Sequence, residues 1–289
     1  IIEDKYQFKP SLPFSPGGEA SGIISEIGEG VDGFIVGDRV IVSAGWGCFV
    51  EKILVDPSAL TSIPDSMDFD TAASFLMTYG TSHHALKDRA DLKKGDSLLV
   101  LGAAGGVGLA AVEIGNAIGA HVIAAASTEE KVQICRDHGA KDGLVYKTGS
   151  LDRDEQKSLS NQIKDLTAGL GANVIYDPVG GDYAEPSLRA IAWEGRYLVV
   201  GFAAGYIPKI PLNLALLKGC QIVGVFWGAF KAQFQDQHND NVADLLKMYD
   251  DGHLKPHISG VYDLSNGAKA IKDLAERKAK GKIVVKVKS

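Results

Sequence analysis

From Ser97 onward, short apolar runs alternate with stretches in which apolar residues recur at helical spacing. The runs predict strands at 97–102, 121–126, 143–147, 172–178, 196–202 and 221–227. The stretches between them predict helices at about 106–118, 128–138, 154–168 and 182–193. Because strands that alternate with crossover helices pair in parallel, the pattern predicts an α/β fold with a doubly wound parallel sheet.

The chain up to about Met77 has a different pattern. Short apolar runs at 22–27, 38–42 and 49–55 are separated by glycine-rich turns, which is typical of a compact all-β unit. We expect three late elements, a helix near 238–251, a helix at 265–279 and a strand at 282–288, to fold back on this unit.

The segment 72–86 lies between the two patterns. It has helical spacing that is broken at Gly80, and we expect it to cross between the domains. Its two histidines, His83 and His84, are expected to be core or surface residues rather than catalytic groups.

A glycine-rich turn, Gly102–Gly108, ends the first predicted strand of the sheet and opens the following helix. Glycine lets a backbone approach a pyrophosphate closely, and a helix start offers free N–H groups and a partial positive charge. The order strand, turn, helix, strand is that of a dinucleotide-binding unit. The predicted cofactor contacts in this turn are Ala104, Gly105, Gly106, Val107 and Gly108.

The end of the second strand of the sheet bears on which dinucleotide binds. NAD-binding units usually place an acid there to hold the ribose 2′-hydroxyl, whereas this strand ends in Ser127. The absence of an acid leaves room for a 2′-phosphate and favours NADP. A structural role is also open, because Ser127 and Glu130 have the spacing of a helix capping box.

Composition narrows the class of protein. A length of 289 residues suits two domains, and a net charge of −6 gives no electrostatic basis for binding nucleic acid. Three well-separated cysteines without a CxxC pair argue against a disulfide framework and favour a reducing, cytoplasmic setting. No signal peptide and no membrane-spanning segment is visible, and the start at Ile1 without Met predicts that an N-terminal portion is missing.

Several short motifs give the chain a family resemblance. It resembles the zinc-free quinone oxidoreductase branch of the medium-chain dehydrogenase/reductase superfamily. The matching stretches are 16–22, 28–30, 37–40, the turn 103–108, 176–181 and 281–284. The resemblance implies a GroES-like catalytic domain at 1–79 and 229–289 and a Rossmann cofactor-binding domain at 80–228.

Zinc enzymes of this superfamily carry a histidine directly before the glutamate that corresponds to Glu19. Here that position is Gly18, and the cysteine cluster of their structural zinc site is also missing. Without these ligands there is no zinc Lewis acid to polarise an alcohol, so we expect no metal site. The pair His253 and His257 has metal-like spacing, but Pro256 denies it the helix that would align both rings.

The resemblance also implies roles for single residues. Lys131 and Tyr146 would join Ser127 around the 2′-phosphate, Arg277 would approach the same phosphate, and Thr81 would lie near the cofactor phosphates. Tyr6 would face the substrate and donate a hydrogen bond to a carbonyl oxygen. Four residues at strand ends would line the nicotinamide side: Gly201, Phe202, Phe226 and Trp227. Asp177 also ends a strand and so faces the ligand crevice, although a turn role beside Pro178 is open. The ordinary packing or capping roles of all these residues stay open at this point.

These features together predict an NADPH-dependent reductase that transfers hydride to a quinone. The alternatives are reduction of a double bond in an enone, enal or enoyl thioester, and a non-catalytic NADPH-binding protein. The last strand of the predicted sheet, 221–227, would lie at an exposed edge. Relatives pair this strand across a two-fold axis, so the resemblance implies a homodimer.

Overall fold

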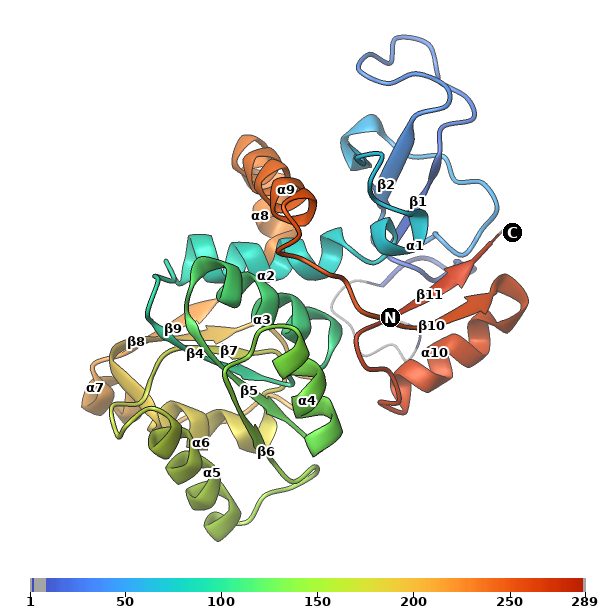
Figure 1. Ribbon diagram of the computed structural model, residues 1–289. Coiled ribbons are helices and arrows are strands. Elements are labelled where there is room, and N and C mark those ends of the chain that lie inside the picture. The colour runs from blue at the N-terminus through green and yellow to red at the C-terminus, as the bar shows by residue number, and fades with distance from the viewer. Residues whose placement is uncertain (1, 3–8, 288–289) are drawn as a thin grey trace. The chain divides into compact units, whose positions relative to one another are not determined.

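The computed structural model describes residue 2 and residues 9–287. The chain forms two compact units, one made of Ile1–Met77 with Pro256–Ser289 and the other of Thr78–Lys255. Figure 1 shows both units and the labels used below. Within the described residues, no helix is both long enough and apolar enough to cross a bilayer.

The larger unit, Thr78–Lys255, is built on a six-stranded sheet. Its strands are β4 (Ser97–Leu101), β5 (His121–Ala126), β6 (Asp142–Val145), β7 (Ala172–Asp177), β8 (Ile191–Val199) and β9 (Gln221–Gly224). They pair in parallel throughout, in the order β6-β5-β4-β7-β8-β9. The order reverses between β4 and β7, which is where doubly wound folds bind ligands. The predicted fold class is confirmed for this unit.

Helices cover both faces of this sheet (Figure 1). The helices are α3 (Gly106–Ile118), α4 (Glu129–Asp137), α5 (Arg153–Leu166), α6 (Ala184–Arg189) and α7 (Asn213–Lys218). Leu99, Leu101 and Ile175 point to one face and form a buried core with Leu159 and Ile163 of α5. The alternate residues face α3. This helix lies close to the sheet at Gly115, since a Cβ placed there would lie 3.1 Å from Val122.

Two strands of the sheet have bounds that differ from the prediction. β8 begins at Ile191, inside the predicted helix 182–193, because α6 ends at Arg189. A register shift against β7 and the positive φ of Glu194 (58°) show an irregular entry into this strand. β9 ends at Gly224 rather than at 227, and Trp227 instead begins a helix, α8 (Trp227–Gln233).

The smaller unit is rich in β-structure. β1 (Glu19–Ile23), β2 (Arg39–Ser43) and β3 (Leu60–Ser62) form an antiparallel sheet. β10 (Ile258–Asp263) and β11 (Lys282–Lys286) pair in parallel and are joined by a helix, α10 (Gly267–Ala275). Short helical turns are η1 (Pro57–Ala59), α1 (Phe69–Ala72) and η5 (Leu264–Asn266).

The predicted strand at 49–55 is wrong. The third strand of this sheet is β3, at 60–62, and 49–55 is irregular. The apolar character of this segment serves packing instead. A Cβ placed on Gly17 would lie 2.6 Å from the ring of Phe49, and one placed on Gly267 would lie 3.3 Å from it. Both glycines therefore make room for this one aromatic ring.

The sequence analysis expects the segment 229–255 to join the β-rich unit, but it groups with the parallel sheet instead. Helix α9 (Gln235–Asp250) is tied by polar contacts to the segment 81–89. Asp244 accepts from Lys87 Nζ at 2.6 Å and lies 3.0 Å from His83 Nε2, and Asn241 Nδ2 donates to Asp88 at 2.7 Å. The spacing of polar residues on α9 does not reveal such distant partners.

The segment that joins the two sequence patterns is helical from Leu76 to Arg89 and is not broken at Gly80. It runs through the π-helical turn η2 (Leu76–Gly80), α2 (Thr81–His83) and a second π-helical turn, η3 (His84–Arg89). Gly80 has helical angles, with φ −61° and ψ −44°. A Cβ at this position would lie 2.8 Å from the indole of Trp227. Gly80 is therefore required by packing and does not interrupt the helix.

We expect Gly80→Ala to destabilise the protein by about 1–3 kcal/mol, because the added methyl overpacks against Trp227. In a Trp227→Leu background the same change should be neutral or stabilising, since alanine has the higher helix propensity. Urea unfolding of both pairs measures the difference. An equal effect of Gly80→Ala in the two backgrounds would contradict this assignment.

Candidate functional site

The turn between β4 and α3 is shaped by its glycines. Gly102 has a positive φ of 59°. A Cβ on Gly108 would overlap the carbonyl oxygen of Gly102 and lie 2.9 Å from Cα of Ala103. The first turn of α3 therefore packs directly on the backbone that ends β4, which only glycine at position 108 permits.

The start of α3 is open to a ligand. Gly105 is its N-cap residue, and no side chain caps the helix. Gly105 is exposed and Gly106 and Val107 are half-buried, whereas Ala104 is 4% exposed. The first N–H groups of a helix that lacks a side-chain cap form a site for an anion, and the helix dipole adds to it. This cradle fits a dinucleotide pyrophosphate.

Thr81 lies next to this cradle. Its neighbour Ser82 donates from Oγ to the carbonyl oxygen of Val107 at 2.8 Å and lies 2.9 Å from the hydroxyl of Tyr176. These contacts fix the start of α2 against the first turn of α3. Thr81 itself is half-buried. Thr81 is thus the chain neighbour of a residue that contacts the first turn of α3.

The residues predicted to surround a 2′-phosphate gather at the ends of β5 and β6. Lys131 Nζ lies 3.3 Å from Ser127 Oγ. The backbone N–H of Tyr146 donates to Ala126 at 3.0 Å, and its ring lies 4.8 Å from that of Tyr183. The capping role considered for Ser127 is wrong. Thr128 is the N-cap of α4, and its Oγ1 accepts from the N–H of Lys131 at 3.3 Å.

Both carboxylate oxygens of Asp177 accept hydrogen bonds from other groups of the protein. It is 3% exposed, and one carboxylate oxygen accepts from the N–H groups of Val179 and Gly180 at 2.7 and 2.8 Å. The other accepts from the hydroxyl of Tyr197. Burial raises the pKa of this carboxyl. The turn role was one of its two predicted roles, and these contacts assign Asp177 to shaping the loop 178–181.

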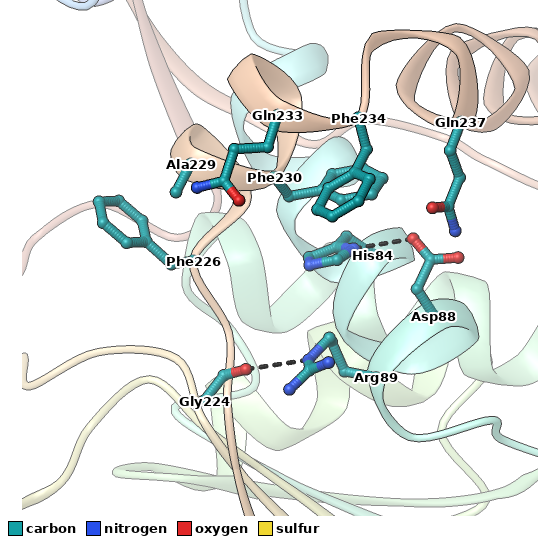
Figure 2. Close-up of a pocket in the computed structure, with 10 residues that line it drawn as sticks. All are labelled: His84, Asp88, Arg89, Gly224, Phe226, Ala229, Phe230, Gln233, Phe234 and Gln237. Carbon is teal, nitrogen blue, oxygen red and sulfur yellow. Dashed lines mark hydrogen bonds and ion pairs between the residues drawn. The ribbon is translucent and has the colours of Figure 1, made fainter.

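The predicted residues after β8 and β9 have different surroundings. Phe202 lies over Gly180, where a Cβ would be 2.9 Å from its ring, and it is 38% exposed. Gly201 packs on Pro178, whose oxygen would lie 3.2 Å from a Cβ. Trp227 is used in packing against Gly80 and has its ring 5.5 Å from that of His238. Phe226 lines a separate cavity (Figure 2).

Two predicted residues are not among the described residues of the larger unit. Arg277 follows α10 in the smaller unit and has a positive φ of 58°. Tyr6 falls outside the described residues. Their roles toward a cofactor or substrate stay predictions.

Sequence reasoning missed Glu113, which is 3% exposed in the middle of α3. Its Oε2 accepts from the hydroxyl of Tyr79 at 2.7 Å and from the N–H of Lys255 at 3.0 Å, and its Oε1 contacts His138 Nδ1. Along the chain, Tyr79 lies at the beginning of the larger unit and Lys255 lies at its end. A single acid in a helix whose other residues, apart from Asn116, are apolar was the available signal.

Glu19 is likewise engaged within the smaller unit. One of its oxygens accepts from Lys282 Nζ at 2.6 Å and the other from the N–H of Met77 at 2.9 Å. Among residue 2 and residues 9–287, no three His, Cys, Asp or Glu side chains group as a metal ion would require.

Comparison with known proteins agrees with this arrangement. A family model described as alcohol dehydrogenase GroES-like domain matches residues 1–65, and one described as zinc-binding dehydrogenase matches 106–244. A quinone oxidoreductase-like protein 2 homolog from Nematostella vectensis is 40% identical over 98% of this chain and 76% of its own length. The quinone oxidoreductase-like protein 2 of Rattus norvegicus is 36% identical over 100% of this chain and 80% of its own length.

The chain belongs to the zinc-free quinone oxidoreductase branch of the medium-chain dehydrogenase/reductase superfamily. A mycobacterial protein solved as a complex with NADPH has a TM-score of 0.88 and 29% identity, over 96% of this chain and 84% of that one. The GroES-like assignment of the β-rich unit is thereby confirmed. This protein is therefore an oxidoreductase, and members of its superfamily bind nicotinamide cofactors.

We expect Gly108→Ala in this oxidoreductase to lower the free energy of unfolding by about 1–3 kcal/mol and to weaken dinucleotide binding, because the methyl pushes α3 off the turn. Gly22→Ala is the matched control, since a Cβ there meets no atom within 4 Å. Thermal unfolding and cofactor titration measure both effects. Equal behaviour of the two variants would refute the close-packing argument.

Proposed function

We propose that this protein is an NADPH-dependent reductase that transfers hydride to a quinone. The observation that carries the proposal is the start of α3, which has no side-chain cap, together with the Ser127–Lys131 pair at the end of the neighbouring strand. The first suits a pyrophosphate and the second suits a further phosphate on the adenosine ribose.

The preference for NADPH rests on charge. An acid at the end of β5 would repel a 2′-phosphate, but Ser127 stands there, and the ammonium of Lys131 lies 3.3 Å from its hydroxyl oxygen. Both side chains are half-buried, so their attraction to a phosphate is screened less than at a fully exposed site. Tyr146 adds a phenol at the end of the adjacent strand.

When bound, the nicotinamide supplies the hydride. The protein's own part is to bind and orient. The start of α3 holds the pyrophosphate, Thr81 sits beside it, and Phe202 and the loop 178–181 shape the crevice at the carboxyl ends of the strands. Hydride transfer to a quinone gives a hydroquinone anion, and water can protonate this anion. The reaction therefore requires no buried acid from the chain.

The test is oxidation of NADPH by the full chain across a panel of benzoquinones and naphthoquinones, with product analysis. Quinone-dependent turnover to the hydroquinone supports the proposal. Turnover of enones or enoyl thioesters alone would replace it with double-bond reduction. Tight NADPH binding without turnover of any acceptor would replace it with a non-catalytic role.

Lys131→Ala should raise the KM for NADPH roughly tenfold, through loss of a charge-assisted hydrogen bond to phosphate, and leave that for NADH unchanged. Lys157→Ala, which removes an exposed lysine of α5, is the control. Steady-state kinetics with both cofactors measure the ratio. An equal rise for NADPH and NADH would argue against a 2′-phosphate site.

We also propose that the protein works in a reducing, cytoplasmic compartment. All three cysteines are free thiols, and burial raises the pKa of Cys48 to about 11 and that of Cys135 to about 12. Such thiols are poor nucleophiles at neutral pH and are suited to packing rather than to redox work.

The proposal also includes a homodimer through the segment 221–227. β9 is an edge strand, and Ile222 within it is 42% exposed. An apolar edge of this kind invites pairing with another strand. We expect a dimer by light scattering at micromolar concentration and a monomer for Ile222→Lys. Val261→Lys, at a residue of β10 that is 48% exposed, should leave the dimer intact. A monomeric wild type would overturn this part.

A further inference from the structure

The loop 146–151 leads from β6 to α5 and begins with Tyr146, the residue that the proposed function places beside a 2′-phosphate. Its residues 147–150 are all exposed, and Gly149 turns the chain with a positive φ of 92°. An exposed loop is mobile unless other parts of the protein hold it. The contacts that hold this loop therefore decide how well Tyr146 is placed.

Tyr183 holds the loop from inside the protein. This side chain is 4% exposed and belongs to the buried core of the larger unit. Its hydroxyl donates to the carbonyl oxygen of Lys147 at 2.9 Å and to that of Gly149 at 3.1 Å, so the two oxygens share one hydrogen. Its ring also lies 4.8 Å from the ring of Tyr146. A single buried side chain thus contacts three residues of the loop.

Asp182 fixes the far end of the same loop. Its Oδ2 accepts from the backbone N–H of Leu151 at 2.9 Å, and the side chain of Leu151 is packed in the core that contains Tyr183. Asp182 also accepts a hydrogen bond from the hydroxyl of Tyr206, which raises the pKa of that phenol. This carboxylate therefore joins the loop after β6 to the chain that follows β8.

These contacts connect parts of the sheet that are not neighbours. Asp182 and Tyr183 belong to the short helical turn η4 (Gly181–Tyr183), which follows β7. β5 and β4 lie between β6 and β7 in the sheet, so the carboxyl ends of β6 and β7 are on the order of 14 Å apart at the usual strand spacing. The loop that carries Tyr146 is therefore held from the far side of the crevice, next to the loop that Asp177 shapes.

The loop also carries an ion pair at the surface. Lys147 Nζ lies 2.6 Å from Glu155 Oε1, and the lysine is well exposed. Exposed ion pairs contribute little to stability, because water and salt screen them. A hydrogen bond from a buried hydroxyl is not screened in this way, so the position of the loop depends more on Tyr183 than on this pair.

We propose that Tyr183 is a positioning residue for the choice of cofactor: it holds the loop 146–151 so that Tyr146 is placed for a 2′-phosphate, and thereby favours NADPH over NADH. The inference rests on the proposed function, since it requires a phosphate beside Ser127 and Lys131. A site that is already held in its bound conformation loses less freedom on binding and so binds more tightly. NADH has no 2′-phosphate, so its binding does not depend on this loop.

Tyr183→Phe tests the proposal, because it keeps the ring beside Tyr146 and removes only the hydroxyl. We expect the KM for NADPH to rise about three- to tenfold, the loss of roughly one hydrogen bond, and the KM for NADH and both kcat values to stay within about twofold. Amide exchange in the cofactor-free variant should become faster in the peptide 146–151. In a Tyr146→Phe background, Tyr183→Phe should change the ratio of the two KM values little further.

Tyr79→Phe is the matched control. Tyr79 is 3% exposed in the same unit, and its hydroxyl donates to Glu113 at 2.7 Å, so this change also removes one buried, hydrogen-bonded hydroxyl. It should leave the ratio of the KM values for NADPH and NADH unchanged and the exchange in 146–151 as in the wild type. A merely structural role of Tyr183 would lower stability, as in Tyr79→Phe, without changing that ratio.

The outcomes separate this inference from the proposed function. If the wild type prefers NADPH and Tyr183→Phe leaves the ratio or the loop exchange unchanged, the role of Tyr183 is overturned and the NADPH-dependent reductase stands. An equal shift of the ratio in Tyr79→Phe, or a full additional shift in the Tyr146→Phe background, would also overturn it. A wild type without preference for NADPH would overturn the proposed cofactor and this inference with it.

Discussion

In the larger unit, the position of α3 depends on the close contact between the first turn of this helix and the backbone that ends β4. Gly108 has no room for a Cβ against Gly102 and Ala103, so the helix starts directly on the turn. This contact aims the helix start, which has no side-chain cap, at the crevice where the strand order reverses. Anion binding, the position of Thr81 and the packing of α3 on the sheet all depend on it.

The same helix carries a second constraint. Glu113 lies two turns further along α3 and holds Tyr79 and Lys255, which lie at the two ends of the larger unit. A buried carboxylate is costly unless donors satisfy it, and here Tyr79, Lys255 and His138 do so. The helix that offers its start to the cofactor therefore also anchors both points at which the chain enters and leaves that unit.

Local sequence signals predicted the sheet and the glycine turn, because apolar runs and strand ends are set by neighbours along the chain. The grouping of Ser127, Lys131 and Tyr146 was implied by the family resemblance. Predictions failed at positions whose conformation is set by packing against residues that are distant in the sequence. Phe49 lies in an irregular segment because Gly17 and Gly267 receive its ring, and Gly80 stays helical because Trp227 needs its space. The exact cap, Thr128 instead of Ser127, and the Asp88–His84 pair in a cavity wall depend on side-chain geometry that spacing alone does not carry.

Hydrogen exchange with and without cofactor tests the central claim most directly. If α3 holds the pyrophosphate and the Ser127–Lys131 pair holds a 2′-phosphate, saturating NADPH slows exchange in peptides covering 102–109 and 127–131. NADH at equal saturation slows exchange in the first peptide and leaves the second unchanged. Unchanged exchange in 102–109 with either cofactor, or equal protection of 127–131 by both, would contradict the account.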